Sequence, residues 1–269
     1  MALGASVGVG AGGARWWTVP VAMIVSVALQ VGVNYANDYS DGVRGTDDVR
    51  VGPMRLVASG AATASQVKMA AFSAFGVAAL AGLVLAVTTS WWLVAVGAAS
   101  MLAGWLYTGG AHPYGYMGLG EVFVFVFFGL VATVGTTFVV IERVPSVAWL
   151  LGTAAGVLAC SLLVVNNLRD IPTDSVVGKH TLAVRLGDSR TRVLYASLLS
   201  IAFAIVVLIA VNDRPEVAVA LFAAAFAVRP VREVLAGASG RELISVLGAT
   251  GRLQLVFGLL ATLGMVASV

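Results

Sequence analysis

Most of this chain consists of apolar stretches about as long as a lipid bilayer is thick. A helix needs about 20 apolar residues to cross the hydrocarbon core. Residues 17–37 and 146–167 each meet this length without a single charged side chain. Only 11% of the chain is charged and 59% is hydrophobic, whereas a soluble domain has about 25% charged residues. The sequence therefore predicts an integral membrane protein.

The predicted fold class is all-α, because only helices satisfy their own backbone hydrogen bonds in lipid. We expect one transmembrane domain over residues 1–269, with about nine helices around a central cavity. The predicted spans are 1–14, 17–37, 66–88, 91–108, 118–141, 146–167, 192–211, 216–231 and 251–268. The first is short for a full span, so we expect that helix to be truncated. Thr63 to Gln66 fits a capping box that opens the third span.

The polar segments between these spans form two groups. Residues 38–65, 109–117, 168–191 and 232–250 are long and charged, whereas the turns near 15, 88–90, 142–146 and 212–215 are short. Of the 16 Lys and Arg residues, only Arg15, Arg143 and Arg214 lie on the short-turn side. Because positive residues favour the cytoplasmic side, we expect the long loops to be cytoplasmic.

A first acidic motif follows the span that ends near residue 37, with four aspartates between Asp38 and Asp48. On a continuing helix, Asn34, Asp38 and Asp41 share one face. Carboxylates this close repel one another unless a cation lies between them. Oxygen ligands with no nearby His or Cys suit Mg²⁺, which takes one or two carboxylates plus phosphate oxygens. The alternative is a solvated acidic loop.

A second acidic motif follows the span that ends near residue 167. Asp170 and Asp174 lie four residues apart, although we expect Pro172 to disturb a regular helix between them. Alone, this motif could be an ordinary salt-bridge loop beside the membrane. The basic residues around it suit a diphosphate, because Arg binds phosphate through paired hydrogen bonds and Lys as a point charge. They are Arg169, Lys179 and Arg185.

The two motifs occupy equivalent places in a faint internal repeat. Asn34 and Asp38 precede the first long loop, and Asn166 and Asp170 precede another, each 132 residues later (166 − 34 and 170 − 38). Internal duplication is common in membrane folds with a cavity site. We therefore expect two four-helix repeats and one further helix, with both motifs facing one cavity as a pair of metal sites.

Other polar residues allow more than one interpretation. Interfacial tyrosines are common membrane anchors, and this explains Tyr116. Glu121 at the mouth of a helix is costlier and points to a function. Arg50 and Arg55 could reach the same anion as the motifs, or serve only the positive-inside bias. Cys160, the single cysteine, is expected to be a small buried thiol between helices.

Three ordered motifs resemble the UbiA superfamily of intramembrane prenyltransferases. They are "NDYSDGVRGTD" with "RVGPMR", then "YTGGAHPYGYMGLGE", then "NNLRDIPTDSVVGKHTLAVRLG". The most similar branch is the 1,4-dihydroxy-2-naphthoate polyprenyltransferases of menaquinone synthesis. The resemblance covers residues from about 34 to 190, and the last four spans add only hydropathy.

The resemblance implies Mg²⁺-dependent transfer of a polyprenyl group from polyprenyl diphosphate to 1,4-dihydroxy-2-naphthoate, with loss of CO₂, giving demethylmenaquinone. It implies a prokaryotic plasma membrane with its lipids as surroundings, cytoplasmic site loops and no nucleic-acid partner. The implied metal-binding residues are Asp38, Asp41, Asp47, Asp170 and Asp174, all but Asp47 also catalytic. The implied substrate-binding residues are Asn34, Asn37, Arg44, Arg55, Tyr107, Glu121, Asn167, Arg169, Lys179 and Arg185. Gly45 stands where the superfamily pattern has its third aspartate, which leaves Asp47 against Asp48 open.

Three alternatives remain to be weighed. The acceptor could be another aromatic, such as homogentisate or 4-hydroxybenzoate. An ion-coupled secondary transporter would also carry intramembrane carboxylates, but near the midplane and not at helix ends on one face. A CDP-alcohol phosphotransferase is excluded, because "DYSDG" is not followed by that family's Ala-Arg or by nearby aspartates.

Overall fold

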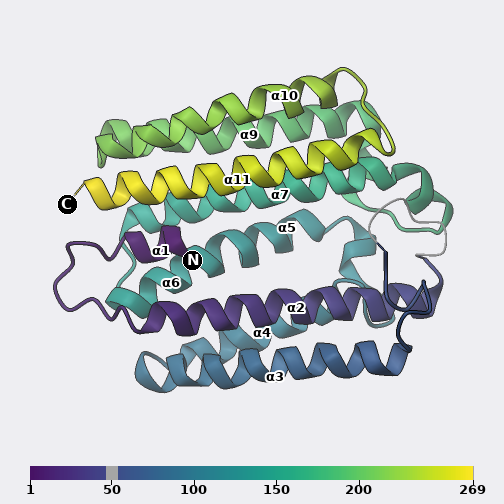
Figure 1. Cartoon of the computed structure of the whole chain (residues 1–269), viewed down its shortest axis with the longest axis horizontal. Coiled ribbons are helices and arrows are strands. Elements are labelled where there is room, and N and C mark those ends of the chain that lie inside the picture. Colours follow the sequence, from purple (N-terminus) through teal and green to yellow (C-terminus); the bar gives the residue numbers. More distant parts are fainter. Residues whose placement is uncertain (47–53, 269) are drawn as a thin grey trace. The chain divides into compact units, whose positions relative to one another are not determined.

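The computed structural model describes residues 1–46 and 54–268, and within these ranges every regular element is a helix (Figure 1). Six helices there are long and apolar enough to cross a membrane. They are Thr18–Arg44 (α2), Ala64–Thr88 (α3), Gly120–Ile141, Ser146–Val176 (α7), Asp188–Asn212 (α9) and Glu242–Ala267 (α11). The all-α class is confirmed for the described part of the chain, which is a multi-span membrane protein.

The remaining elements are shorter. The span Gly120–Ile141 consists of α5 (Gly120–Val124), the π-helical η2 (Phe125–Val131) and α6 (Ala132–Ile141). The others are α1 (Ala2–Ser6), α4 (Trp92–Leu106), the 3₁₀ helix η1 (Tyr114–Met117), α8 (Leu182–Leu186), the 3₁₀ helix η3 (Pro215–Ala223) and α10 (Ala224–Leu235). The predicted capping box is confirmed: Thr63 accepts from the Gln66 N–H, and the Gln66 side chain accepts from the Thr63 N–H.

Three predicted spans differ from the structure. Residues 1–14 contain only the five-residue α1, because the glycine-rich stretch after it forms turns. The span expected at 91–108 is the 15-residue α4. The span expected at 216–231 begins as the 3₁₀ helix η3 and continues as α10, with Pro230 inside it. The count of nine spans therefore stays a prediction.

Two helices continue well past their predicted ends, and both carry an aspartate motif. Helix α2 runs to Arg44 instead of residue 37, and α7 runs to Val176 instead of residue 167. The expectation that Pro172 disturbs the second motif was wrong, because it lies inside α7. The turn after it still closes, since the Val177 N–H donates to the Thr173 carbonyl at 3.3 Å.

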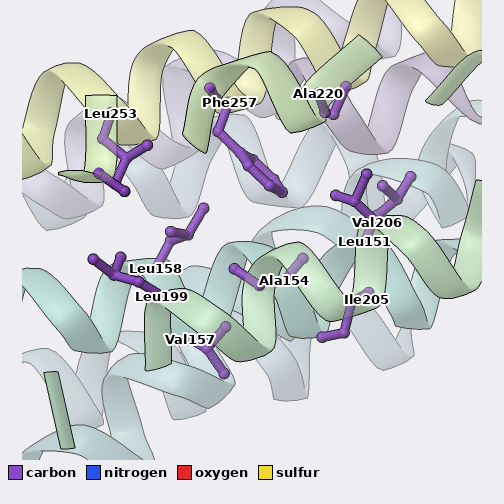
Figure 2. Close-up of a cluster of buried hydrophobic side chains, with 14 of the residues drawn as sticks. Leu151, Ala154, Val157, Leu158, Leu199, Ile205, Val206, Ala220, Leu253 and Phe257 are labelled. Carbon is purple, nitrogen blue, oxygen red and sulfur yellow. The ribbon is translucent and has the colours of Figure 1, made fainter. Parts of the chain in front are cut away.

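The chain divides into two compact units, which we describe separately. The larger unit contains residues 1–19, 121–171 and 186–269, and the smaller unit contains residues 20–120 and 172–185. In the larger unit, apolar side chains of α7, α9, η3 and α11 form one buried cluster that includes Leu151, Val206 and Phe257 (Figure 2). In the smaller unit, Phe75 of α3 packs in a cluster with Ala36 of α2. The single-domain prediction and the internal repeat stay predictions.

Two helices of the larger unit approach each other at backbone distance. A Cβ added at Gly129 of η2 would lie 2.4 Å from Gly156 Cα and 2.7 Å from the Gly152 carbonyl oxygen. Gly152 and Gly156 of α7 have the small-xxx-small spacing that allows close helix packing in membranes. These glycines therefore fix how the Gly120–Ile141 span packs against α7.

We expect Gly129→Ala to lower the thermal unfolding temperature of the detergent-solubilised protein. Backbone atoms of α7 cannot move aside as a flexible side chain can, and overpacking typically costs about 1–3 kcal/mol. The matched control is Gly135→Ala in α6, where an added Cβ meets nothing within 4 Å. Equal unfolding temperatures for the two variants would contradict the packing argument.

Candidate active site

The first motif begins with Asp38 of α2, which lies in the smaller unit and is 5% exposed. Its carboxylate accepts hydrogen bonds from the backbone N–H groups of Leu56 (2.8 Å) and Val57 (3.0 Å). Asp38 therefore anchors the segment after the motif to α2. A carboxylate has about four acceptor positions, so both oxygens retain capacity for a cation.

The end of α2 places Asp41 beside Tyr116. The helix closes with Gly45 in the left-handed conformation (φ 72°), and the Thr46 N–H donates to the Asp41 carbonyl at 3.1 Å. The Gly45 N–H donates to the Gly42 carbonyl at 3.3 Å, which completes a Schellman motif. The Tyr116 hydroxyl donates to Asp41 Oδ1 at 2.8 Å and lies 3.3 Å from Thr46 Oγ1.

Two cations lie over the Tyr116 ring. Arg44 Cζ is 5.5 Å and Lys179 Nζ is 5.3 Å from the ring centroid, within the range of a cation–π contact. Lys179 Nζ also lies 3.6 Å from Asp174 Oδ1. Within the smaller unit, Tyr116 therefore connects Asp41 of the first motif to Lys179 and Asp174 of the second.

The Tyr116 hydroxyl is the donor of its hydrogen bond with Asp41 at neutral pH. Burial raises the pKa of Tyr116 to about 12, and the neighbouring Asp41 carboxylate acts in the same direction. The phenol is consequently protonated, and the hydrogen bond runs from Tyr116 to the carboxylate of Asp41.

The segment after α4 holds the polar side chains of the first motif. The Thr108 hydroxyl donates to Asn37 Oδ1 at 2.9 Å. The Arg44 guanidinium donates to the backbone carbonyls of Thr108 and Gly110. Thr108 is 1% exposed, so this interaction is shielded from water.

The second motif ends in the same way as the first. Gly178 is left-handed (φ 72°), and the Lys179 N–H donates to the Asp174 carbonyl at 2.9 Å. Asp174 is 7% exposed. The Arg185 side chain lies against Gly118, where an added Cβ would be 3.0 Å from Nε. Arg185 therefore lies next to the end of the short helix that carries Tyr116.

A separate polar cluster lies on the part of α7 that belongs to the larger unit. Arg169 donates to both oxygens of Asp170, from Nε at 2.6 Å and from Nη2 at 2.7 Å, and to Asn166 Oδ1 at 3.0 Å. The Arg169 side chain is only 1% exposed. Its guanidinium thus offsets the charge of Asp170 and fixes the orientation of that carboxylate.

Glu121, at the start of α5, is buried in the same unit. Its Oε1 accepts from Asn167 Nδ2 at 3.0 Å. Its Oε2 is buried and has no hydrogen-bond partner among the described residues. Cys160 Sγ lies 3.1 Å from the Glu121 backbone oxygen, which confirms the expected buried thiol. An orphaned carboxylate oxygen is costly, and it offers an acceptor to a ligand.

Some predicted residues lie apart from these contacts. Asn34 is exposed and donates back to the Gln30 carbonyl at 2.9 Å. The Tyr107 ring packs edge-on against Tyr114, with centroids 5.5 Å apart. Arg55 comes directly before Leu56, whose backbone N–H donates to Asp38. The residues Asp47, Asp48 and Arg50 lie outside the described ranges.

Two contacting residues were not predicted from the sequence. Tyr116 was interpreted as a membrane anchor, and Thr108 was not singled out. A signal for both was present in the motif "YTGGAHPYGY", which places hydroxyl groups close to the first motif only after the chain has folded. Their partners are 75 and 71 residues away in the sequence.

The donor set of the two motifs fits Mg²⁺. Within the described ranges, no three His, Cys, Asp or Glu side chains converge as a ready-made metal site. Mg²⁺ does not need one, because it binds one or two carboxylates together with waters and phosphate oxygens. Asp38 and Asp41 are both buried and supply only oxygen. The neighbouring cations Arg44 and Lys179 suit the phosphate oxygens that would complete the coordination.

Comparisons with known proteins point to one family of enzymes. Residues 1–241 match the model of the UbiA prenyltransferase family. The 1,4-dihydroxy-2-naphthoate octaprenyltransferase of Mycobacterium tuberculosis is 53% identical over 91% of this chain and 84% of that protein. The enzyme of the same name from Escherichia coli is 37% identical over 68% of this chain and 64% of that protein.

Solved structures share the fold at low sequence identity. A digeranylgeranylglyceryl phosphate synthase has a TM-score of 0.65 at 12% identity, covering 98% of this chain and 91% of that one. A UbiA homologue from Archaeoglobus fulgidus, bound to GPP and Mg²⁺, has a TM-score of 0.61 at 14% identity, covering 99% and 94%. The family match over most of the chain and the identity to curated members show that this chain belongs to the UbiA prenyltransferase family.

Proposed function

We propose that this chain transfers a polyprenyl group from polyprenyl diphosphate to 1,4-dihydroxy-2-naphthoate, releasing diphosphate and the carboxylate as CO₂, to give demethylmenaquinol, the reduced form of demethylmenaquinone. The observation that carries this proposal is that both aspartate motifs meet at Tyr116, whose hydroxyl donates to Asp41 and whose ring faces Lys179, the partner of Asp174. The acceptor follows from the relatives, since a protein 53% identical to this chain has the name of a 1,4-dihydroxy-2-naphthoate octaprenyltransferase.

We assign the metal to the aspartates of the two motifs, which are Asp38, Asp41, Asp170 and Asp174, with Asp47 beyond the described residues. When bound, Mg²⁺ withdraws charge from the diphosphate as the allylic C–O bond breaks. The chain's own contribution is to hold these carboxylates in place. Asp38 is held by two backbone N–H groups, and Asp170 by Arg169.

We assign the diphosphate to the cations of the smaller unit. Lys179 supplies a point charge beside Asp174, and Arg44 and Arg185 supply planar guanidinium groups. Asn37 supplies a side-chain amide next to Arg44 through their shared partner Thr108. We assign Arg169 a different role, which is to orient Asp170, because its guanidinium already binds that carboxylate.

We assign the acceptor to Glu121 at the start of α5 and its partner Asn167 on α7. Asn167 fixes one oxygen of Glu121, so that Oε2 is oriented to accept a hydrogen bond from a ring hydroxyl. Such a bond donates electron density to the ring and makes its carbon more nucleophilic. The prenyl cation needs an apolar enclosure that excludes water.

We place the enzyme in a plasma membrane with its long loops in the cytoplasm. The concentration of Lys and Arg at these loops supports this orientation. The isoprenoid tails of donor and product can remain in the lipid, so a long chain never has to enter water.

We expect Asp41→Asn and Asp170→Asn each to lower the rate of prenyl transfer roughly 100-fold or more. Each removes a carboxylate charge that we assign to Mg²⁺, the ion that stabilises the diphosphate leaving group. Asparagine preserves the shape and one acceptor oxygen, so Asp41→Asn should keep the unfolding temperature of the parent protein. Asp170→Asn should lower it, because the buried Arg169 guanidinium loses one of its two acceptors and its counter-charge. Asp213→Asn, an exposed aspartate outside both motifs, is the matched control and should retain full activity. Full activity of either motif variant would refute the metal assignment.

Glu121→Gln should lower kcat about 10²-fold, because the amide is a weaker acceptor for the ring hydroxyl, while the KM for the prenyl diphosphate stays unchanged. The exposed Glu216→Gln in η3 is the control for a lost carboxylate. A rise in the KM for the prenyl diphosphate without a fall in kcat would place Glu121 at the donor instead of the acceptor.

Mass spectrometry of a competition reaction tests the substrates. Purified protein receives Mg²⁺, a polyprenyl diphosphate and equal amounts of 1,4-dihydroxy-2-naphthoate, homogentisate and 4-hydroxybenzoate. We expect only the decarboxylated prenyl-naphthalene product, its loss with a chelator, and its return with Mg²⁺. A product from another acceptor would overturn the naphthoate assignment. Ion-coupled uptake into proteoliposomes without any prenyl product would favour a transporter.

A further inference from the structure

Four contacts from the two motifs meet at one side chain. The Tyr116 hydroxyl binds the Asp41 carboxylate and contacts the Thr46 hydroxyl, and its ring faces both Arg44 and Lys179. All five residues belong to the smaller unit. Thr46 and Lys179 have the same structural role, since each follows the left-handed glycine that ends a motif helix.

We propose that Tyr116 is the positioning residue that holds Asp41 of the first motif and Lys179 of the second in the arrangement needed to bind one Mg²⁺–diphosphate group. The inference rests on the proposed function for the chemistry of that ligand. Tyr116 acts through its neighbours, since the hydroxyl orients the carboxylate and the ring orients the two cations.

The hydroxyl and the ring have separate tasks. The Tyr116 hydroxyl donates a hydrogen bond to Asp41 Oδ1, which fixes the orientation of the carboxylate that we assign to the metal. The ring provides a common face for two positive charges that would otherwise repel each other. Lys179 remains within 3.6 Å of Asp174, so the ring also links the cation to the second motif's carboxylate.

A simple membrane anchor does not explain these contacts. An interfacial tyrosine directs its hydroxyl to water or headgroups, whereas the Tyr116 hydroxyl is directed to the buried Asp41. Tyr114 on the same short helix has the simpler role, because its hydroxyl donates to the Ala103 backbone carbonyl at 2.8 Å. Tyr114 therefore provides a matched control.

The test is a calorimetric titration of inorganic pyrophosphate into the full-length protein in detergent, at a series of fixed Mg²⁺ concentrations. It compares the parent protein with Tyr116→Phe, Tyr116→Leu and Tyr114→Phe. This series gives the Mg²⁺ concentration for half-maximal binding and the pyrophosphate affinity at saturating Mg²⁺. Prenyl-transfer rates and unfolding temperatures are measured on the same samples.

Tyr116→Phe should raise the half-maximal Mg²⁺ concentration about 10-fold, as expected for loss of a hydrogen bond to a metal ligand. Its pyrophosphate affinity and kcat at saturating Mg²⁺ should stay near those of the parent, because the ring remains. Tyr116→Leu should in addition weaken pyrophosphate binding about 3- to 10-fold, because Arg44 and Lys179 lose their common aromatic face. Tyr114→Phe should match the parent protein in both quantities.

Unchanged Mg²⁺ dependence in Tyr116→Phe would overturn the inference, as would an equal shift in Tyr114→Phe. The Phe comparison decides the question even where Tyr116→Leu unfolds. If the variants show these binding shifts but the parent protein forms no prenyl product, only the proposed function is refuted. Product formation with an unshifted Tyr116→Phe would refute only the role of Tyr116.

Discussion

Carboxylates at the carboxyl end of a helix are electrostatically costly, because the last carbonyl groups already carry partial negative charge. Asp41 and Asp174 both lie in the final turns of their helices, and both are buried. Each has an adjacent positive or donor group, Tyr116 for the first and Lys179 for the second. Within the smaller unit, these partners place a hydrogen-bond donor and a cation beside the two buried carboxylates.

The apolar part of the fold could be predicted from hydropathy, but the ends of the two motif helices could not. Hydropathy reports the length of chain that lipid can accommodate, so the predicted spans stopped where polar residues began. Helices α2 and α7 continue beyond that point, to Arg44 and Val176. Their ends are set by local backbone chemistry, a left-handed glycine with hydrogen bonds to the preceding turn. A hydropathy pattern does not report these backbone hydrogen bonds.

Site residues could be predicted where their position depends only on spacing along one helix. They could not be predicted where their role depends on contacts with distant parts of the sequence. Asp38 and Asp41 lie on one helix, as their spacing indicated. Asn34 fits the same pattern, yet it is exposed and donates to the Gln30 carbonyl of its own helix. Tyr116 has its hydrogen-bond partner 75 residues away, so its role depends on the folded arrangement of the smaller unit. As an isolated tyrosine near a span, it had the features of an anchor.

The departure of the first motif from the superfamily pattern has a structural reason. Where that pattern has a third aspartate, this chain has Gly45, and the backbone there is left-handed. An aspartate would adopt that conformation at a cost, whereas glycine does so freely. Helix α2 therefore ends at the position where it would otherwise present another carboxylate. The resulting turn brings Thr46 to the Tyr116 hydroxyl. At the end of α7, the turn at Gly178 brings Lys179 to the Tyr116 ring. The left-handed glycine and Tyr116 thus together fix the end of α2, where Asp41 lies.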